Sequence, residues 1–441
     1  MTDSKPPHPW MTRHTFAGSP PTCATVRAGE RSNRHRLLAV AMEGIRGPDS
    51  QRVALVHDFL VSLRGADRVF LEICNLWPNA EVFTPVYDEE GTEGRFVHRN
   101  VHTSFLQRLR PNRRTFRVLL PLYPAAVESF DLSGYDLVVS SSSAWAHAAI
   151  CDEHAVHVCY CHNPFRYAWN ERHRALAERP DPVTRAALRG FFRRWREWDW
   201  IAAQRVDRYL TNSRTTQARI KAFFGRGARI VHPPVELARF SLTEPGDYYL
   251  VLSELVSHKR IDTAVEAFAA LRLPLVVVGD GPDRRRLRRM APPNVRFLGR
   301  VGDEQAARLL AGCRAFVLTG VEEFGIAAVE AQAAGRPVIA RRGGGVLETV
   351  VDGVTGCLWE GGAEELVEAV RSFDTYAIDP GACVANARRF DQAVFREELP
   401  RQVELAVRER LSEAESGTRE RRMVARPRMP GTRRTRGVPL R

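Results

Sequence analysis

The sequence is poor in lysine, has few cysteines and contains no long hydrophobic run. Only three of its 441 residues are lysines, Lys5, Lys221 and Lys259, so arginine carries almost all of the positive charge. The eight cysteines form no C-x-x-C pair, which argues against a zinc site or a disulfide scaffold. No stretch reaches the roughly 18 apolar residues of a transmembrane helix, and the N-terminus lacks the apolar core of a signal peptide. We therefore expect a cytoplasmic protein.

The net charge of +13 comes mostly from the two ends of the chain. Residues 1–50 carry +3 and residues 419–441 carry +8, which leaves +2 for the rest. Neither end has a sustained apolar pattern, so we expect a disordered extension over 1–50 and a disordered basic tail over 413–441. A start of translation at Met42 is a hypothesis that this pattern allows. A solvated tail is favoured over one that binds nucleic acid or anionic lipid.

Short apolar runs alternate with amphipathic stretches between the two ends, a pattern typical of parallel sheets with helices on both faces. The expected strands are at 53–57, 80–84, 135–140, 156–160, 208–212, 248–253, 274–279, 295–298, 315–319 and 337–340. The clearest expected helices are at 66–76, 182–203, 261–271, 283–290, 303–312 and 326–334. The sequence thus predicts an α/β fold.

Two doubly wound, Rossmann-like domains account for this order of elements. We expect the first at 51–235 and the second at 246–390, because Pro-rich turns interrupt the pattern at 230–247. Helices at 391–412, with a kink at Pro400, need an apolar surface and are expected to pack back toward the first domain. Ligands of such sheets bind beyond the carboxyl ends of the strands, so the cleft between the domains is the expected site.

The segment 321–330, VEEFGIAAVE, joins an expected strand to an expected helix. Gly325 and Ile326 put free backbone N–H groups at the start of that helix, which suits an anion such as a diphosphate. Glu322 precedes the helix and can point into the cleft. Glu330 lies one turn in, where a carboxylate can accept hydrogen bonds from a ribose diol. The plainer alternative is that both glutamates only complement the helix dipole.

Cations, glycines and a histidine follow other expected strands. Lys259 and the adjacent Arg260 could meet a phosphate, or could be solvated cations at a helix start. Gly344, in a triple-glycine turn, and Gly65, in the segment RGAD, allow close approach of the backbone to a ligand, although such turns also occur without one. His162 follows a strand and could hydrogen-bond a sugar hydroxyl, although lone histidines are more often structural.

Together these segments resemble family 4 glycosyltransferases of the GT-B fold. In the second half the resemblance rests on VVVGDGP, EEFGIAAVEAQAAGRPVIA and GGGVLETVVDGVTG. In the first half, ALVHDFLVSLRGADRV and HVCYCHNPFRYAWN resemble the bacterial polysaccharide-assembly, mannosyltransferase-like branch. The resemblance covers about 53–395 in the right order, which makes it more specific than any single motif.

The resemblance implies a retaining transfer of a hexose from a nucleotide-diphosphate sugar to a hydroxyl of a lipid-linked or polysaccharide acceptor, with no metal or cofactor required. GDP-mannose is the first candidate donor, and UDP-sugars follow. The first domain would take the acceptor and the second the donor. The implied catalytic residues are His162, near the reaction centre, Glu322, at the donor sugar, and Lys259, at the diphosphate. The implied donor-binding residues are Gly65, Arg260, Gly325, Ile326, Glu330 and Gly344.

Two positions depart from the family pattern. Glu254 stands where many relatives have an arginine that binds the diphosphate, and Ala66 stands where many have a second glycine. The departure at Glu254 leaves a non-catalytic subunit that binds nucleotide sugars as an alternative. A GT-B-fold sugar-nucleotide epimerase is a separate alternative, which would need acid/base carboxylates of its own. Residues 105–123 mix five arginines with apolar side chains. They favour either a solvated basic loop or contact with an anionic membrane surface, on the inner face of the cell membrane.

Overall fold

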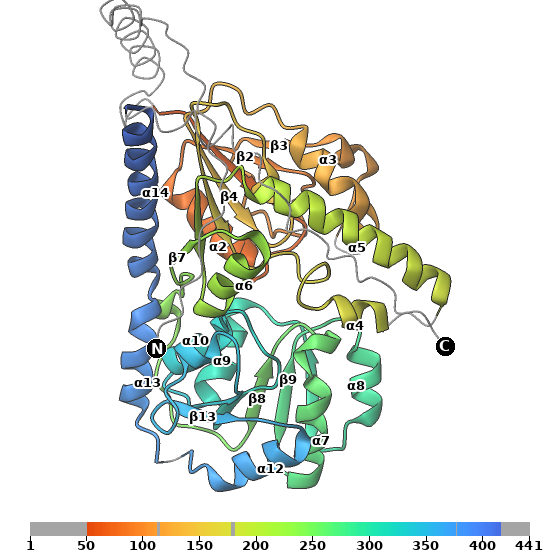
Figure 1. The fold of residues 1–441 in the computed structure, drawn as a ribbon. Helices are drawn as coiled ribbons and strands as arrows, with labels where there is room; N and C mark the ends of the chain where they lie inside the picture. The colour runs from red at the N-terminus through yellow and green to blue at the C-terminus, as the bar shows by residue number, and fades with distance from the viewer. Residues whose placement is uncertain (1–50, 113–114, 178–180, 376, 416–441) are drawn as a thin grey trace, which may run out of the picture.

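The computed structural model describes residues 51–112, 115–177, 181–375 and 377–415. They form two α/β domains, which lie one above the other in Figure 1. The expectations for 1–50, including a start at Met42, and for 416–441 concern residues outside these ranges. The disordered tail was expected from 413, but residues 413–415 belong to a helix. Each domain has a parallel sheet with apolar clusters on both of its faces, as the alternating pattern of the sequence predicts.

Seven parallel strands form the sheet of the first domain, in the order β3-β2-β1-β4-β5-β6-β7. Their bounds are Val53–His57 (β1), Glu81–Thr84 (β2), Val101–Thr103 (β3), Leu137–Ser142 (β4), Val156–Cys161 (β5), Arg208–Thr211 (β6) and Ala228–Ile230 (β7). The strand order reverses between β1 and β4, where Leu55 lies opposite Val139. This reversal is the topological switch point, beyond which ligands of such sheets bind.

The helices of the first domain cover both faces of this sheet (Figure 1). They are α2 (Gly65–Leu76), α3 (Tyr123–Glu128), α4 (Arg172–Ala177), α5 (Pro182–Ala203) and α6 (Arg214–Phe224), with short 3₁₀ segments η1 (Phe105–Leu109), η2 (Phe116–Leu122) and η3 (Ala146–Ala148). Helix α5 begins where the sequence predicts, because the Asp181 carboxylate accepts hydrogen bonds from the first free N–H groups and Pro182 occupies the first turn.

The second domain repeats the arrangement with six parallel strands, in the order β10-β9-β8-β11-β12-β13. Their bounds are Tyr249–Leu252 (β8), Leu275–Val278 (β9), Val295–Gly299 (β10), Ala315–Leu318 (β11), Val338–Arg341 (β12) and Gly356–Trp359 (β13). The helices are α7 (Ile261–Leu271), α8 (Arg284–Met290), α9 (Asp303–Gly312), α10 (Ile326–Ala333), α11 (Val346–Thr349), α12 (Ala363–Ser372) and α13 (Pro380–Ala387), with 3₁₀ segments η4 (Leu237–Arg239), η5 (Ser257–Lys259) and η6 (Arg388–Phe390). Here the strand order reverses between β8 and β11.

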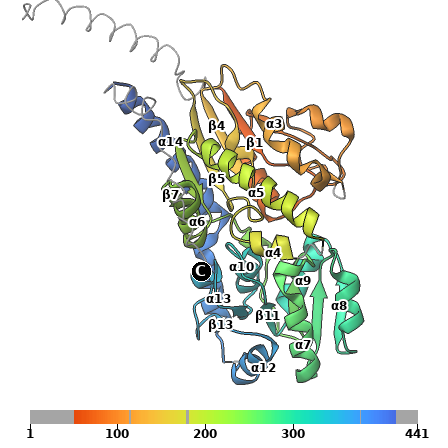
Figure 2. The same cartoon turned by 45° about the vertical axis from the view of Figure 1, so that its right-hand side comes forward.

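The last helix, α14 (Gln392–Glu415), returns to the first domain, alongside which it runs in Figures 1 and 2. Its buried Phe395, Leu399 and Val403 join the apolar cluster that includes Leu55 of β1. The helix continues through Pro400, where the sequence suggested a kink between separate helices. Of the helices that the structure describes, none combines the length and the apolar character needed to cross a membrane.

Candidate active site

A cleft of about 690 Å³ separates the two domains, and its size is in the usual range for a ligand site. Segments that follow the carboxyl ends of strands in both sheets line it. The first sheet contributes His57 at the end of β1, Ser143 after β4 and His162 after β5. The second sheet contributes Glu254 after β8 and Glu322 after β11. The switch points of both sheets therefore open into the same cleft.

Two helix N-termini meet across this cleft. Gly65 begins α2, and Ile326 begins α10. A Cβ atom at Gly65 would lie 3.5 Å from Cδ1 of Ile326, so the two helix starts are in close proximity. Gly325 precedes α10 with a φ of 89°, a left-handed conformation that favours glycine. The unpaired N–H groups and the dipoles of both helices favour an anion between them.

Glu322 lies in the second domain beside Lys259, whose ammonium donates a hydrogen bond to its carboxylate. The triple-glycine turn fixes the backbone of this loop, because the N–H of Gly345 donates to the carbonyl of Glu322 over 2.8 Å. Gly344 has a φ of 69°, and a Cβ atom there would lie 2.0 Å from the same carbonyl oxygen. Gly344 is not one of the residues that line the cleft, so its contact is with Glu322.

Glu330 lines the cleft from the second turn of α10. Burial raises the pKa of its carboxyl, although the guanidinium groups of Arg239 and Arg68 act in the opposite direction. Arg260, by contrast, does not line the cleft. Its guanidinium donates to Oγ1 of Thr263 over 3.1 Å, along its own helix α7.

His162 lines the cleft directly after β5, and Ser141 of the neighbouring strand β4 contacts its ring. Its Nε2 lies 2.9 Å from Oγ of Ser141. Burial, with the neighbouring His57, lowers the pKa of His162 to about 3, so its imidazole is neutral at physiological pH. His57 in turn lies 3.1 Å from the carbonyl of Ser141 and 3.0 Å from Asp67, which accepts a hydrogen bond from the N–H of Arg64. Polar contacts therefore link His162 to the start of α2.

Arginines from the first domain reach carboxylates of the second, and no sequence signal singled them out. Arg166 and Arg219 lie 3.1 and 3.2 Å from Glu323. Although burial raises the pKa of this carboxyl, the cations Arg166, Lys259 and Arg219 outweigh that effect and lower it. Arginines are so numerous in this sequence that a particular one could be chosen only through its partner in the other domain.

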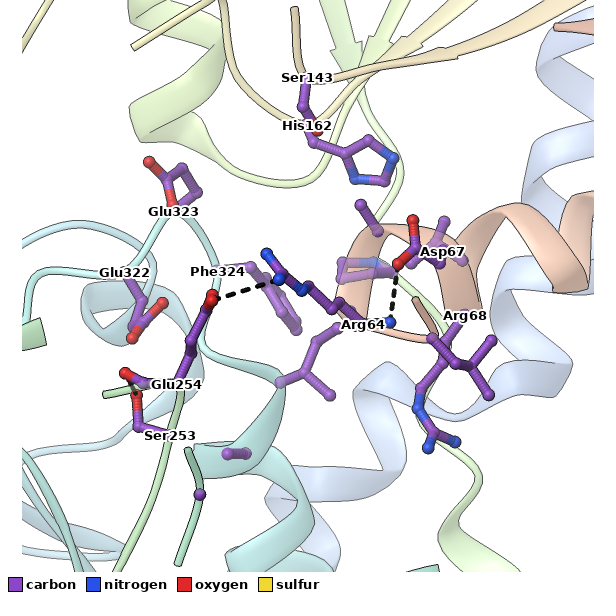
Figure 3. A pocket seen from close by; sticks show the side chains of 18 of the residues that line it. Arg64, Asp67, Arg68, Ser143, His162, Ser253, Glu254, Glu322, Glu323 and Phe324 are labelled. Carbon is purple, nitrogen blue, oxygen red and sulfur yellow. Dashed lines mark hydrogen bonds and ion pairs between the residues drawn. The ribbon is translucent and has the colours of Figure 1, made fainter. Parts of the chain in front are cut away.

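Glu254, which departs from the family pattern, is also paired with arginines of the first domain. Its carboxylate lies 3.3 Å from Nη2 of Arg64 and 3.8 Å from Nη2 of Arg117. Figure 3 shows the side chain of Arg64 extending across the pocket to Glu254, with Glu322 and Glu323 on the same side as Glu254. Within the described part of the chain, no group of three histidine, cysteine or acidic side chains could hold a metal ion.

Two family models match the chain in succession. The model Glycosyltransferase Family 4 matches residues 63–239, and the model Glycosyl transferases group 1 matches residues 236–390. Together they span both domains. The chain belongs to the family 4-like glycosyltransferases of the GT-B fold. The resemblance and the fold class inferred from the sequence are thereby confirmed.

Curated relatives of this glycosyltransferase match it over part of their length. It is 36% identical over 108 residues to a GDP-mannose-dependent alpha-mannosyltransferase of Corynebacterium glutamicum, which is 24% of this chain and 26% of that one. Over 183 residues it is 33% identical to a GDP-mannose-dependent alpha-(1-6)-phosphatidylinositol monomannoside mannosyltransferase of Mycolicibacterium smegmatis, which is 34% of this chain and 48% of that one. The chain therefore spans about a quarter to about a half of these relatives.

Solved structures share the fold at low sequence identity. Anabaena HepE in complex with UDP has a TM-score of 0.60 at 18% identity, covering 80% of this chain and 100% of that one. Sucrose-phosphate synthase from Thermosynechococcus elongatus has a TM-score of 0.63 at 19% identity, covering 81% and 100%. At this identity they establish the two-domain architecture alone.

Proposed function

We propose that this glycosyltransferase moves a hexose from a nucleotide-diphosphate sugar to an acceptor hydroxyl with retention of configuration. The observation that carries the proposal is the meeting of the N-termini of α2 and α10 in one cleft, beside Lys259 and Glu322. Mannose from GDP-mannose is the first candidate, because two curated relatives are named as GDP-mannose-dependent enzymes. A UDP-sugar is the second, because HepE was solved with UDP.

The chemistry requires groups that stabilise negative charge on the departing diphosphate. As the bond between the sugar and the diphosphate breaks, that charge grows, and backbone N–H groups already oriented toward it lower the barrier. In this proposal the helix starts at Gly65 and at Gly325 and Ile326 face the diphosphate, and Lys259 adds a cation. Its partner Glu322 is then free to accept hydrogen bonds from hydroxyls of the donor sugar. Glu330 accepts hydrogen bonds from the ribose.

His162 approaches the donor sugar from the opposite domain. Because its imidazole is neutral, it contributes a hydrogen bond and no charge. In this arrangement the second domain, over 246–390, holds the donor and the first, over 51–235, offers the acceptor. The acceptor hydroxyl belongs to a lipid-linked or polysaccharide chain, in keeping with the phosphatidylinositol mannoside named for one relative.

A thermal-shift screen against GDP, UDP, ADP, TDP and their sugars tests the donor class. We expect one nucleotide to raise the melting temperature, since a ligand that binds only the folded state stabilises it. Glu330→Ala should lose most of this shift. Glu266→Ala is the control, because Glu266 is exposed on α7 outside the cleft. No shift with any nucleotide at millimolar concentration would contradict the proposal.

Donor turnover separates this proposal from its alternatives. A transferase releases the nucleoside diphosphate when an acceptor is present. An epimerase converts the donor sugar, and the nucleoside diphosphate is not released. A non-catalytic subunit binds the donor and leaves it intact. Release of GDP from GDP-mannose that depends on added membrane lipid extract is the expected result.

Exposed apolar side chains in two 3₁₀ segments of the first domain support a membrane-bound acceptor. Four apolar side chains are 44–78% exposed: Phe105 and Leu109 of η1, and Val118 and Leu122 of η2. In the sequence, Arg108 and Arg110 stand on either side of Leu109. Apolar side chains beside arginines favour an anionic lipid surface. We expect flotation with anionic liposomes at low salt and its loss in Leu109→Glu. Val354→Glu, at a half-exposed position of the second domain, is the control. Flotation that Leu109→Glu leaves unchanged would argue against this surface.

A further inference from the structure

We propose that Arg64 and Arg117 bind the diphosphate from the first domain, and that Glu254 holds both guanidinium groups until the diphosphate displaces it. This inference rests on the proposed function and identifies further donor-binding residues for it. Arg64 precedes α2, Arg117 lies in η2, and Glu254 follows β8 in the other domain. All three line the cleft.

The position of Arg64 fits a phosphate ligand. Its backbone N–H donates to Oδ2 of Asp67 over 2.8 Å, which fixes the residue at the N-terminus of α2. The next residue, Gly65, is the one that approaches Ile326 across the cleft. The Arg64 guanidinium therefore extends from the point where the two helix N-termini favour an anion. A guanidinium can form two parallel hydrogen bonds to phosphate oxygens.

The contact between Arg64 and Glu254 is longer than those of two other interdomain pairs in the cleft, and it involves a single oxygen. Arg68 donates two hydrogen bonds to Asp303, of 2.9 and 2.7 Å, and Arg166 donates two to Glu323, both of 3.1 Å. Arg64 approaches Glu254 at one oxygen, at 3.3 Å. The side chains of Arg64 and Glu254 are about 30% exposed, against 36% and 38% for Arg68 and Asp303, so the single long contact, and not exposure, distinguishes this pair. An entering anion would therefore exchange with this pair more readily than with either of those two.

Arg117 completes the exchange site. Its Nη2 lies 3.8 Å from the same oxygen of Glu254, and half of its side chain is exposed. One carboxylate thus faces two cations. Their two positive charges are balanced better by a diphosphate, which carries more than one negative charge, than by a single glutamate. When the diphosphate leaves as product, Glu254 can pair with both arginines again. Glu254 therefore competes with the donor and with the nucleoside diphosphate product alike.

Isothermal titration of four variants with GDP-mannose and with inorganic pyrophosphate tests the exchange. We expect Glu254→Gln to lower Kd for both probes about fivefold, the effect of removing one exposed ion pair. Arg64→Gln should raise Kd about tenfold, because a charge-assisted phosphate contact is lost. In the triple variant R64Q/R117Q/E254Q, Kd should match that of R64Q/R117Q, because Glu254 then has no cation to withhold.

Glu93→Gln is the matched control. Glu93 lines the same cleft and pairs across it with Arg300 at 3.1 Å, so its loss removes an interdomain ion pair and leaves Arg64 paired. An unchanged Kd is expected. A Kd lowered as much as in Glu254→Gln would mean that general loosening of the domains causes the effect, and would overturn the proposal. So would a Glu254→Gln effect that persists without Arg64 and Arg117.

The two probes separate this inference from the proposed function. If pyrophosphate shows the expected pattern and GDP-mannose does not bind, the arginine exchange stands and GDP-mannose fails as the donor. If GDP-mannose binds and Arg64→Gln leaves its Kd unchanged, the exchange is wrong and the donor assignment stands. A wild-type protein that binds neither probe would overturn both.

Discussion

Gly344 influences the cleft through the backbone of Glu322, because it does not itself line the cleft. We expect Gly344→Ala to lower turnover about tenfold or more, since the added Cβ would displace the carbonyl of Glu322 and with it the carboxylate. Gly353→Ala is the control, because Gly353 also has a positive φ, of 77°, but a Cβ atom there would meet nothing within 4 Å. Steady-state kinetics of both variants measure the difference. Equal losses would mean that backbone strain alone, about 1–3 kcal/mol, accounts for the effect.

Glu330 should give donor binding a pH dependence. Burial raises the pKa of its carboxyl, so protonation begins at a higher pH than for an ordinary glutamate. The ionised form accepts hydrogen bonds from both ribose hydroxyls, and the protonated form loses part of this capacity. The Kd for GDP should therefore rise as the pH falls through the raised pKa. Titration calorimetry at a series of pH values measures the Kd for GDP. Glu330→Gln should bind GDP more weakly, and its Kd should no longer rise in this pH range. If the Kd of the variant still rises as the pH falls, another group is responsible for the pH dependence.

The cleft residues that the sequence could identify are those that a local motif places after a predicted strand. Gly325 and Glu330 have a fixed spacing on one helix, so a strand followed by that helix already places them at the cleft. Arg64 and Arg117 could not be identified in this way, because their partner Glu254 belongs to the other domain. The departure at Glu254 indicated a missing cation in the second domain, and the cations that meet it come from the first.

At the level of elements, α14 contributes to the stability of the first domain although it follows the second in the chain. Phe395 is 1% exposed in the cluster under this helix, whereas its neighbour Val394 is 46% exposed. We expect Phe395→Ala to lower the free energy of unfolding by about 3–5 kcal/mol, the cost of a large cavity. Val394→Ala should change it by less than about 1 kcal/mol. Urea denaturation compares them, and similar values would contradict the packing of α14.

The accuracy of the predicted elements follows their burial and length. The bounds of α5, α7 and α9 agree with the prediction, because each has a regular apolar face or a clear start signal. Strands β3, β7 and β13 were missed, since each has only three or four residues; β3 and β7 contain no buried residue, whereas β13 contains two. The sequence predicted more than one helix over 391–412, but a single helix continues through Pro400. Its apolar contacts on both sides of the proline offset the loss of one backbone hydrogen bond.

At the level of the whole molecule, charge pairs hold the two domains together around the cleft. Glu323 is central, because Arg166 and Arg219 approach it from two separate segments of the first domain. The pKa of its carboxyl is lowered. The stabilisation that its ion pairs give to the closed arrangement is therefore complete above the ordinary glutamate pKa, and is lost as the pH falls through the lowered pKa. The pairs therefore favour a closed arrangement at neutral pH.

Glu323→Gln should accordingly open the molecule when no donor is bound. The substitution leaves both arginines without a charged partner at Glu323, so the closed arrangement loses part of its stability relative to an open one. Small-angle X-ray scattering should show a larger radius of gyration for the variant, reversed when a nucleotide sugar bridges the domains. Glu360→Gln is the control, because Glu360 pairs with Arg342 within the second domain alone. An unchanged radius in both variants would mean that apolar contacts, rather than these charges, keep the domains closed.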